Sequence, residues 1–344
     1  MLNPSTPETA LSSSPLVTVV IPAFNAESFI GEAIASIRCQ TIEDWQLIVV
    51  DDGSADHTLS AAREAAGDDS RIRLIRFDRN EGISTASNAG FDAAQGEFIA
   101  RVDSDDRLIP HRLAAQVAAF RENDRLAAAG SHASVFGDAP AGIAYCARGD
   151  ANIKARLLDG VNTISGGTLM VRRSFVRKHG IRFDDAARSA EDLDYLASVM
   201  AAGGQLENVD EVLTEHRAHR GSFTSSRGDV AAPWLQTMRR RLIALWYPDL
   251  DPSAIERVVI PFLNTYPNSS DEPLAIVSAI NRLVITQAVD LGQDVSIVHG
   301  ILLDRMRKML GIYQDNKLLD ATQIQSIRHF VAPATRDALD QLTF

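Results

Sequence analysis

The sequence predicts an α/β fold: a mostly parallel central sheet flanked by helices, with a helical appendage at the C-terminal end. In the first hundred residues, short aliphatic and β-branched runs alternate with segments whose apolar residues recur at helical spacing. The runs are apolar on both faces, as expected of strands buried between two layers of helices. Beyond about residue 225 the strand signals stop and helical periodicity dominates.

The elements of the first half follow one another in regular order. Strands are expected at residues 16–21, 46–50, 72–77 and 97–102. Helices are expected at residues 28–38, 56–66, 84–94 and from Pro110 onward. Residues 127–213 give a mixed pattern of shorter strands, with a helix near residues 191–202. Because ligands bind at the carboxyl ends of strands in such sheets, the residues that follow the strands form the candidate site.

Composition excludes several classes of protein. The chain has 344 residues, of which 45% are hydrophobic and 23% charged, as is ordinary for a globular protein. Its formal net charge of −11 argues against broad nucleic-acid binding. Cys39 and Cys146 lie far apart and outside any metal-ligand spacing, which disfavours a zinc site or disulfide framework and fits a reducing compartment.

The N-terminal segment is rich in Ser, Thr and Pro and lacks the basic start and apolar stretch of a signal peptide. We therefore expect a disordered tail over residues 1–15. No uncharged apolar run approaches the roughly 18 residues of a transmembrane helix. The expected location is cytoplasmic, with peripheral contact at the inner membrane left open.

Three carboxylates, Asp103, Asp105 and Asp106, lie within four residues directly after a predicted strand. Ionised carboxylates this close repel one another unless a cation neutralises them. Oxygen ligands on a tight turn suit Mg²⁺ or Mn²⁺, which also bind phosphates. The competing interpretation is that the cluster forms a turn and caps the next helix, and the local residues alone favour this cap.

The first two predicted strands also end in polar turns. Pro22 is expected to stop the first strand, and Asn25 to cap the following helix. Asp52 follows the second strand and can accept a hydrogen bond from a nucleobase or ribose hydroxyl. The alternative, equally weighted, is an Asp-Gly turn with Ser54 as a helix cap.

Five motifs, in their order and spacing, resemble glycosyltransferase family 2. They are VTVVIPAFN at residues 17–25, IVVDDGS at 48–54, NEG at 80–82, NAG at 88–90, and DSDD at 103–106 followed by Pro110 and Arg112. Each motif is weak alone, but the ordered set is specific and covers about residues 16–226. The resemblance implies a GT-A fold and an inverting enzyme that moves a sugar from a nucleotide-diphosphate donor, usually UDP, GDP or TDP linked, to an acceptor hydroxyl.

The resemblance also implies site residues. Asp52 would recognise the nucleobase, Asp103 and Asp105 would form the DxD pair at ribose and metal, and which of Asp105 and Asp106 binds Mg²⁺ or Mn²⁺ directly stays open. His219 is the further candidate metal ligand. The implied donor-binding residues are Pro22, Phe24, Asn25, Asp52, Gly82, Asn88, Asp103, Ser104, Gly167, Arg217, His219 and Arg220.

Segments of the second half extend the resemblance. ISGGTLM at residues 164–170 resembles the small-residue segment that faces donor sugar and acceptor, and EHRAHRGS at 215–222 the loop over the diphosphate. SAEDLDY at 189–195 resembles the ED motif, which makes Asp192 the implied general base. Locally, Ser189 and Asp192 also match a capping box, and the two interpretations are compatible. A lone histidine is more often a surface residue than a ligand, and with the resemblance the two interpretations of His219 are weighted equally.

The resemblance implies a catalytic domain at residues 16–225, with a nucleotide-binding half (16–106) and an acceptor half (107–225). Helical periodicity predicts a helical region at 226–344. Residues 236–240 lack the Trp of the QxxRW motif of processive relatives, so a single addition is expected. The acceptor is a glycan, a lipid-linked molecule or another hydroxyl compound, with a role in bacterial surface polysaccharide or glycan synthesis. The C-terminal helices are expected to pack on the catalytic domain; pairing of two subunits, or membrane contact through residues 239–241 or 305–308, stays open.

Two other functions fit parts of the pattern. A sugar nucleotidyltransferase shares the layout and metal chemistry but is expected to carry a Gly-rich, Arg- or Lys-bearing loop after the first strand, which PAFN at residues 22–25 is not. A non-catalytic nucleotide-sugar-binding module is disfavoured because Asp103, Asp105, Asp106 and Asp192 are all retained.

Overall fold

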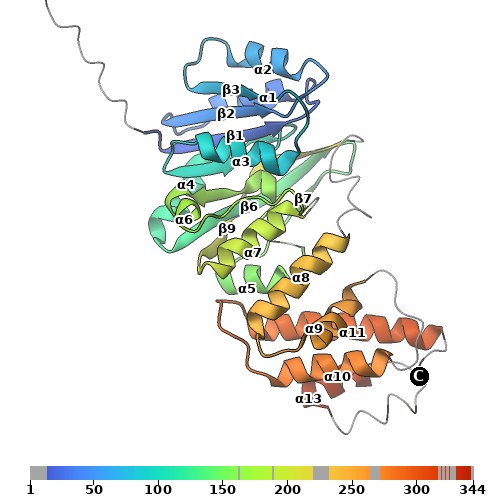
Figure 1. The fold of residues 1–344 in the computed structure, drawn as a ribbon. Helices are drawn as coiled ribbons and strands as arrows, with labels where there is room; N and C mark the ends of the chain where they lie inside the picture. The colour runs from blue at the N-terminus through green and yellow to red at the C-terminus, as the bar shows by residue number, and fades with distance from the viewer. Residues whose placement is uncertain are drawn as a thin grey trace, which may run out of the picture.

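The structure is a computed structural model (Figure 1). It describes residues 14–161, 163–187, 190–219, 232–263, 272–316 and 331–341, together with the single residues 319, 322 and 325. Most of the expected N-terminal tail, along with Ser189 and Arg220, lies outside the described residues.

The described residues form a nine-stranded sheet in the order β3-β2-β1-β4-β8-β6-β9-β5, with β7 paired to β6. The strands are β1 (Val17–Ala23), β2 (Trp45–Asp51), β3 (Ile72–Arg76), β4 (Phe98–Arg101), β5 (Arg107–Leu108), β6 (Leu126–Gly137), β7 (Gly142–Ala144), β8 (Met170–Arg172) and β9 (Gln205–Ala218). The pairs among β1 to β4 are parallel, as is the pair β6–β9, whereas β8 runs antiparallel to both its neighbours. The prediction of a mostly parallel sheet flanked by helices is confirmed.

Helices cover both faces of the sheet because alternate residues of its strands face opposite ways. Val19 and Ile21 of β1 pack in one core with α1 and α4, while Val20 packs in another with Phe91 of α3 and the buried face of α7. The helices of the first 219 residues are α1 (Ile30–Arg38), α2 (Thr58–Ala66), α3 (Ile83–Ala93), α4 (Arg112–Glu122), α5 (Asp150–Arg156), α6 (Arg173–Lys178) and α7 (Glu191–Ala201), with the short 3-10 helix η1 (Gly166–Thr168).

Pro22 does not stop the first strand, contrary to the prediction. It lies inside β1 and pairs with Val50 of β2. The carbonyl of Val20 accepts from the N–H of Val102, the residue after β4, and that of Ala23 accepts from the residue after β2. Pro22 therefore faces the β4 side. Pairing with β4 ends at Val20, so the missing N–H of Pro22 costs no ladder hydrogen bond.

The C-terminal region is helical, as predicted, and packs on the catalytic half. Its elements are α8 (Ala232–Trp246), α9 (Pro252–Val259), η3 (Ile260–Phe262), α10 (Glu272–Ile285), α11 (Val295–Asp315) and α13 (Pro333–Asp340). Trp246 and Leu302 belong to the same buried cluster as Leu196 of α7. The N–H of Asp294 donates to the carbonyl of Ala151, which ties the start of α11 to α5.

The basic runs of this region have partners inside the protein. Arg239 is buried and stacks over Phe262, and Arg240 pairs with Glu256. The other basic residues also form ion pairs: Arg241 with Asp194, Arg305 with Asp159, and Arg307 and Lys308 with Asp304. Within the described residues, no helix combines the length and the apolar composition that crossing a bilayer requires.

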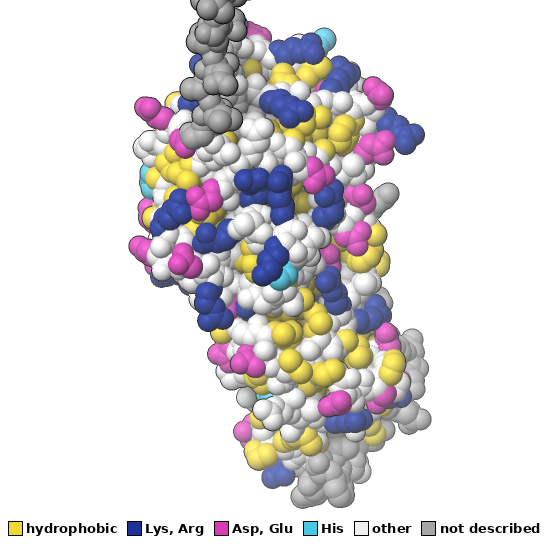
Figure 2. All heavy atoms as spheres, turned by 60° about the vertical axis from the view of Figure 1, so that its left-hand side comes forward, with side chains coloured by type: hydrophobic (Ala, Val, Ile, Leu, Met, Phe, Trp, Pro, Cys, Tyr) yellow, Lys and Arg dark blue, Asp and Glu magenta, His cyan; other side chains and the backbone are white. Residues whose placement is uncertain are grey.

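A surface hollow lies at the edge of the sheet where its strands begin. Arg173 and Arg177 line this hollow of about 570 Å³ with Leu16 and Glu97, which precede β1 and β4. Lys and Arg side chains gather on the face seen in Figure 2. Asp44 also lines the hollow, so its charge is mixed and we assign it no ligand.

Candidate active site

The carboxyl ends of β1, β2 and β4 bring the predicted residues to one edge of the sheet. At the first end, Asp52 is buried and accepts hydrogen bonds from the N–H groups of Glu81 (2.7 Å) and Gly82 (2.9 Å). Gly82 has φ +100°, a conformation that favours glycine. Burial raises the pKa of Asp52 above its ordinary value, despite these donors. Asp52 therefore joins the β2 turn to the loop before α3.

The turn after β1 is fixed by the turn after β2 and does not cap a helix. The N–H of Asn25 donates to Oγ of Ser54 (3.0 Å), and Oδ1 of Asn25 accepts from the N–H of Ala55 (3.0 Å). Helix α1 begins at Ile30 without a side-chain cap, so the predicted caps by Asn25 and Ser54 are wrong. Asn25 has φ +50°, and Phe24 beside it is 47% exposed. Phe24 is thus partly open to solvent, and the residue before it, Ala23, accepts a hydrogen bond from the N–H of Asp52.

Asn88 is partly buried in α3, and its side-chain amide is hydrogen-bonded to the backbone. Its Nδ2 donates to the carbonyl of Phe183 (2.8 Å), and its Oδ1 accepts the N–H of Phe183 (3.0 Å). Both ends of the amide are thus engaged with one backbone residue. Asn88 fixes the segment around Phe183, which reaches the site from the second half of the chain.

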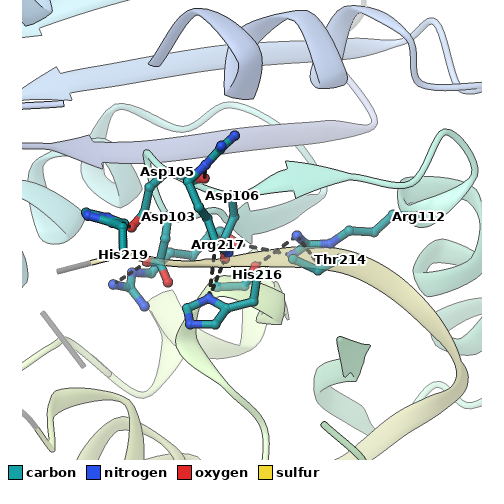
Figure 3. Close-up of polar contacts among 10 residues, drawn as sticks. Asp103, Asp105, Asp106, Arg112, Thr214, His216, Arg217 and His219 are labelled. Carbon is teal, nitrogen blue, oxygen red and sulfur yellow. Dashed lines mark hydrogen bonds and ion pairs between the residues drawn. The ribbon is translucent and has the colours of Figure 1, made fainter. Parts of the chain in front are cut away.

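The acidic cluster after β4 does not cap the next helix. Helix α4 has His111 as its N-cap residue and no side-chain cap, and β5 lies between it and the cluster. The three carboxylates instead find three different partners (Figure 3). Asp103 pairs with Arg101 (3.0 Å) and Asp105 contacts Nε2 of His219 (3.0 Å), while Oδ1 of Asp106 contacts Nδ1 of His216 (3.1 Å).

Burial separates Asp106 from Asp105. Asp106 is 2% exposed, and its Oδ1 also accepts the backbone N–H of Arg217 (3.0 Å). Its hydrogen bond to His216 raises the pKa of that histidine to about 9. The side chain of Asp105 is 19% exposed and that of His219 22%. Asp105 and His219 are therefore open to a ligand, whereas Asp106 is held inside the fold by β9.

Arg217 is held firmly in place beneath the acidic turn. Its Nε donates to the carbonyl of Asp105 (3.0 Å) and its Nη2 to Glu32 (2.7 Å). Its guanidinium lies over the ring of Phe29, which also contacts the ring of His219 at 4.6 Å. The guanidinium is thus pre-positioned beside Asp105 and His219. Arg220, another of the predicted donor-binding residues, lies outside the described residues.

Two adjacent glycines lie where the two halves of the site meet. A Cβ on Gly167 would lie 2.7 Å from Oδ2 of Asp103 and 3.1 Å from Oδ2 of Asp106. A Cβ on Gly166 would lie 1.8 Å from Nη1 of Arg101 and 3.5 Å from Cβ of Asp192. Only glycines fit here, because any side chain would overlap a charged group of the site.

Asp192 lies in the first turn of α7. It is half-buried, and its Oδ1 accepts the N–H of Leu193 (2.9 Å). The N-cap residue of α7 is Ala190, which makes no side-chain cap, and Ser189 of the predicted capping box lies outside the described residues. A helix N-terminus favours the ionised form of a carboxylate. Ser104 lies, half-buried, on the acidic turn between Asp103 and Asp105.

Sequence reasoning missed three residues of this edge: Arg101, Arg112 and His216. Arg112 is fully buried and donates to the carbonyls of Gly167 (2.8 Å) and Arg101 (3.1 Å) and to Oγ1 of Thr214 (3.1 Å). Burial lowers its pKa to about 10. A signal for Arg101 was present, since a charged residue at the end of an apolar strand needs a counter-charge. No local signal marked His216, because its partner is 110 positions away.

Within the described residues, no three His, Cys, Asp or Glu side chains converge as a ready metal cage. Asp105 supplies a carboxylate, which suits Mg²⁺ or Mn²⁺, and His219 supplies an imidazole, which suits transition metals and so favours Mn²⁺ over Mg²⁺. Mg²⁺ commonly takes one or two protein ligands and completes its shell with substrate phosphates and water. The donor set therefore fits a metal that binds together with a diphosphate.

Comparisons with known proteins identify the family of this chain. Residues 18–180 match the model of glycosyl transferase family 2. An uncharacterized glycosyltransferase of Haemophilus influenzae is 33% identical over 225 residues, covering 63% of this chain and 69% of the relative. The putative glycosyltransferase EpsE of Bacillus subtilis is 31% identical, covering 62% of this chain and 77% of EpsE. The chain belongs to glycosyltransferase family 2. It is thus a glycosyltransferase, as the ordered motifs predicted.

Solved structures confirm the fold of this family 2 glycosyltransferase. The crystal structure of S. aureus TarS 1–349 in complex with UDP-GlcNAc superimposes with a TM-score of 0.59 at 17% identity. The match covers 94% of this chain and 90% of the TarS chain. At this identity the likeness establishes the GT-A architecture alone.

Proposed function

We propose that this family 2 glycosyltransferase transfers a sugar, with inversion, from a nucleotide-diphosphate donor to an acceptor hydroxyl. The observation that carries the proposal is the meeting of two groups of acids across Gly166 and Gly167. On one side lie the donor-side carboxylates Asp103 and Asp106, and on the other lies Asp192. A single displacement needs this arrangement, with a base on the acceptor side of the sugar and charge stabilisation on the leaving-group side.

The donor is proposed to lie along the carboxyl ends of β1, β2 and β4. Its base would lie between the exposed face of Phe24 and the carboxylate of Asp52, with Pro22 and Asn25 shaping the turn. The ribose would lie toward Asp103 and Ser104. The diphosphate would lie against Asp105 and His219, where the guanidinium of Arg217 is already held. Gly82 and Gly167 let donor and backbone approach closely.

Asp105 and His219 are the proposed metal ligands, because both side chains are partly exposed and contact each other, whereas Asp103, which is also partly exposed, is already paired with Arg101. Mg²⁺ or Mn²⁺ held there would offset the charge that develops on the leaving diphosphate. Asp106 is proposed to support the turn, since His216 and the N–H of Arg217 already occupy its carboxylate. The proposal therefore makes Asp105, and not Asp106, the direct metal ligand, a choice that the sequence left open.

Asp192 is the proposed general base. It would accept the proton of the acceptor hydroxyl as the hydroxyl oxygen bonds to the anomeric carbon and the bond to the diphosphate breaks. The acceptor is proposed to be a growing surface glycan. The relatives ExoO of Rhizobium meliloti, a succinoglycan biosynthesis protein, and TuaG of Bacillus subtilis, a putative teichuronic acid biosynthesis glycosyltransferase, support this class. The cytoplasmic location stays a prediction.

Calorimetric titration with UDP, GDP and TDP, with and without Mn²⁺, tests the proposal. We expect one nucleotide to bind more tightly with Mn²⁺, and Asp105→Asn to lose that increment. The matched control is Asp124→Asn, an exposed carboxylate at the far end of α4, which should keep it. Binding of none of the three nucleotides in either condition would contradict the proposed function.

A further inference from the structure

Arg101 is a buried charge whose presence the donor site alone does not explain. It is 2% exposed and is therefore out of reach of a substrate. Its Nη2 pairs with Oδ1 of Asp103 at 3.0 Å, and its Nη1 points to the backbone of Gly166. Its Nε finds no hydrogen-bond partner among the described residues. A guanidinium that is buried and incompletely hydrogen-bonded destabilises a fold unless nearby negative charge compensates it.

That negative charge comes from both halves of the site. A Cβ on Gly166 would lie 1.8 Å from Nη1 of Arg101 and 3.5 Å from Cβ of Asp192, so the guanidinium lies close to Asp192. Glu191, which precedes Asp192 in α7, is buried as well. Burial alone would lower the pKa of Arg101, but the carboxylates of Asp103, Glu191 and Asp192 raise it above its ordinary value. The guanidinium thus lies between the donor-side acid and the acidic first turn of α7.

The position of Arg101 is fixed from several directions. Its N–H donates to the carbonyl of Leu169 (2.8 Å), and its carbonyl accepts from Arg112 (3.1 Å). Its guanidinium lies 5.7 Å from the ring centroid of Phe183, whose backbone is held by both ends of the Asn88 amide. Contacts with β4, η1 and α3 therefore fix the position of the Arg101 guanidinium, and the position of α7 can be set relative to it.

We propose that Arg101 is a positioning residue for sugar transfer, which holds the acidic first turn of α7, and with it Asp192, at a fixed place relative to Asp103. This role rests on the proposed function, because it presumes that Asp192 is the base. Without the cation, the carboxylates of Asp103, Glu191 and Asp192 repel one another in a space that is only partly open to water, and α7 moves away from the donor. Asp192 is then displaced from the acceptor hydroxyl, although the residues that bind the donor stay in place.

The first test measures coupling and needs no catalytic activity. It compares the melting temperatures of the wild type, Arg101→Met, Asp192→Asn and the double variant. We expect Asp192→Asn to raise the melting temperature of the Arg101→Met protein more than that of the wild type, because it removes an uncompensated charge. If Arg101→Met alone is unfolded, the double variant is expected to regain folding. Additive effects, or no recovery, would overturn the proposal.

A matched control separates this coupling from the general loss of a buried arginine. Arg239 of α8 is 5% exposed, lies over the ring of Phe262 and donates to the carbonyl of Leu158 (2.9 Å). We expect Arg239→Met to lower the melting temperature and to be additive with Asp192→Asn. Equal coupling in both cycles would contradict a specific link between Arg101 and α7.

The second test measures release of nucleoside diphosphate from UDP-, GDP- and TDP-sugars. We expect Arg101→Met to lower kcat roughly 100-fold with KM for the donor changed less than about tenfold. Arg101→Lys, which keeps the charge, should recover at least about tenfold, and Arg239→Met should keep wild-type kcat per folded molecule. If Arg101→Met keeps the wild-type kcat while the melting-temperature effects of the first test are non-additive, Arg101 stabilises α7 but has no role in transfer. If the wild-type protein binds no nucleotide, the proposed function is wrong. Non-additive melting temperatures would then show only that the contact between Arg101 and α7 stabilises the fold.

Discussion

The edge of the sheet that carries the candidate active site and the C-terminal helical region bury different kinds of side chain. At the edge, Arg101, Arg112, Asp52, Asp106 and Glu191 are all buried. In the described part of the C-terminal region, the core is built from apolar side chains such as Trp246, Leu302 and Met306, and Arg239 is its buried charge. Fixed charges in a poorly solvated site favour transition-state stabilisation but cost stability, whereas apolar burial supplies stability. The comparison predicts that changes at the edge alter activity and changes in the helices alter stability.

The largest expected effect is on Asp192. Asp192→Asn keeps the shape of the side chain but cannot accept the acceptor proton, so kcat for transfer should fall by about 10²–10⁴-fold. The affinity for the nucleotide, measured by calorimetry, should not change, because Asp192 lies across Gly166 from the donor-side acids.

Asp194→Asn is the matched control for this variant. Asp194 lies on the same helix but pairs with Arg241 of α8 at 2.9 Å. We expect transfer to stay within a few-fold of wild type. Equal losses in both variants would show that the acidity of α7 as a whole matters and would remove Asp192 as the base.

The second prediction concerns the apolar core of the C-terminal region. Leu302 of α11 is fully buried, so Leu302→Ala should cost about 2–5 kcal/mol of unfolding free energy. Nucleotide affinity and kcat per folded molecule should not change. Chemical denaturation followed by calorimetry of the folded protein checks both. A loss of kcat in the folded variant would mean that the helices control the site, and the contrast between the two regions would fail.

The third prediction concerns the glycine that faces the donor-side acids. Gly167→Ala places a methyl group 2.7 Å from Asp103, so this carboxylate must move and nucleotide affinity should fall about tenfold or more. Gly31→Ala is the matched control, because a Cβ there has no neighbour within 4 Å and Gly31 lies in α1. It should keep full affinity and gain up to about 1 kcal/mol of stability. Equal affinities in the two variants would place the donor away from Gly167.

The smallest expected effect is a pH dependence of stability. His216 has a pKa raised to about 9 by Asp106, so its ion pair stabilises the fold fully below about pH 6.5, its unfolded value, and is lost as pH rises through about 9. The gap in melting temperature between wild type and His216→Asn should therefore close between pH 7 and pH 10. A gap that stays constant over this range would mean that His216 is neutral in the folded protein.

Much of the fold could be predicted from local pattern. The first four strands and the helices between them appear within one or two residues of their expected positions, because the spacing of apolar residues reflects burial of local segments. The family motifs also drew attention to Asp52, Asp103 and Asp192, whose roles in the site stay predictions. Expectations that rested on local capping were wrong for Asn25, Ser54 and the acidic turn, since their polar groups bond to residues about 30 to 110 positions away.

The sequence by itself determined the family, the parallel core and the acids that end its strands, because these depend on short-range periodicity and on residues close together in the chain. The tertiary structure decided that β8 inserts antiparallel between β4 and β6, which brings Gly166 and Gly167 between the donor-side acids and Asp192. It also decided that Asp106 is buried against His216 while Asp105 stays open, and that Arg101 lies between Asp103 and α7. Burial and charge pairing depend on segments far apart in the chain, so no local pattern contains them.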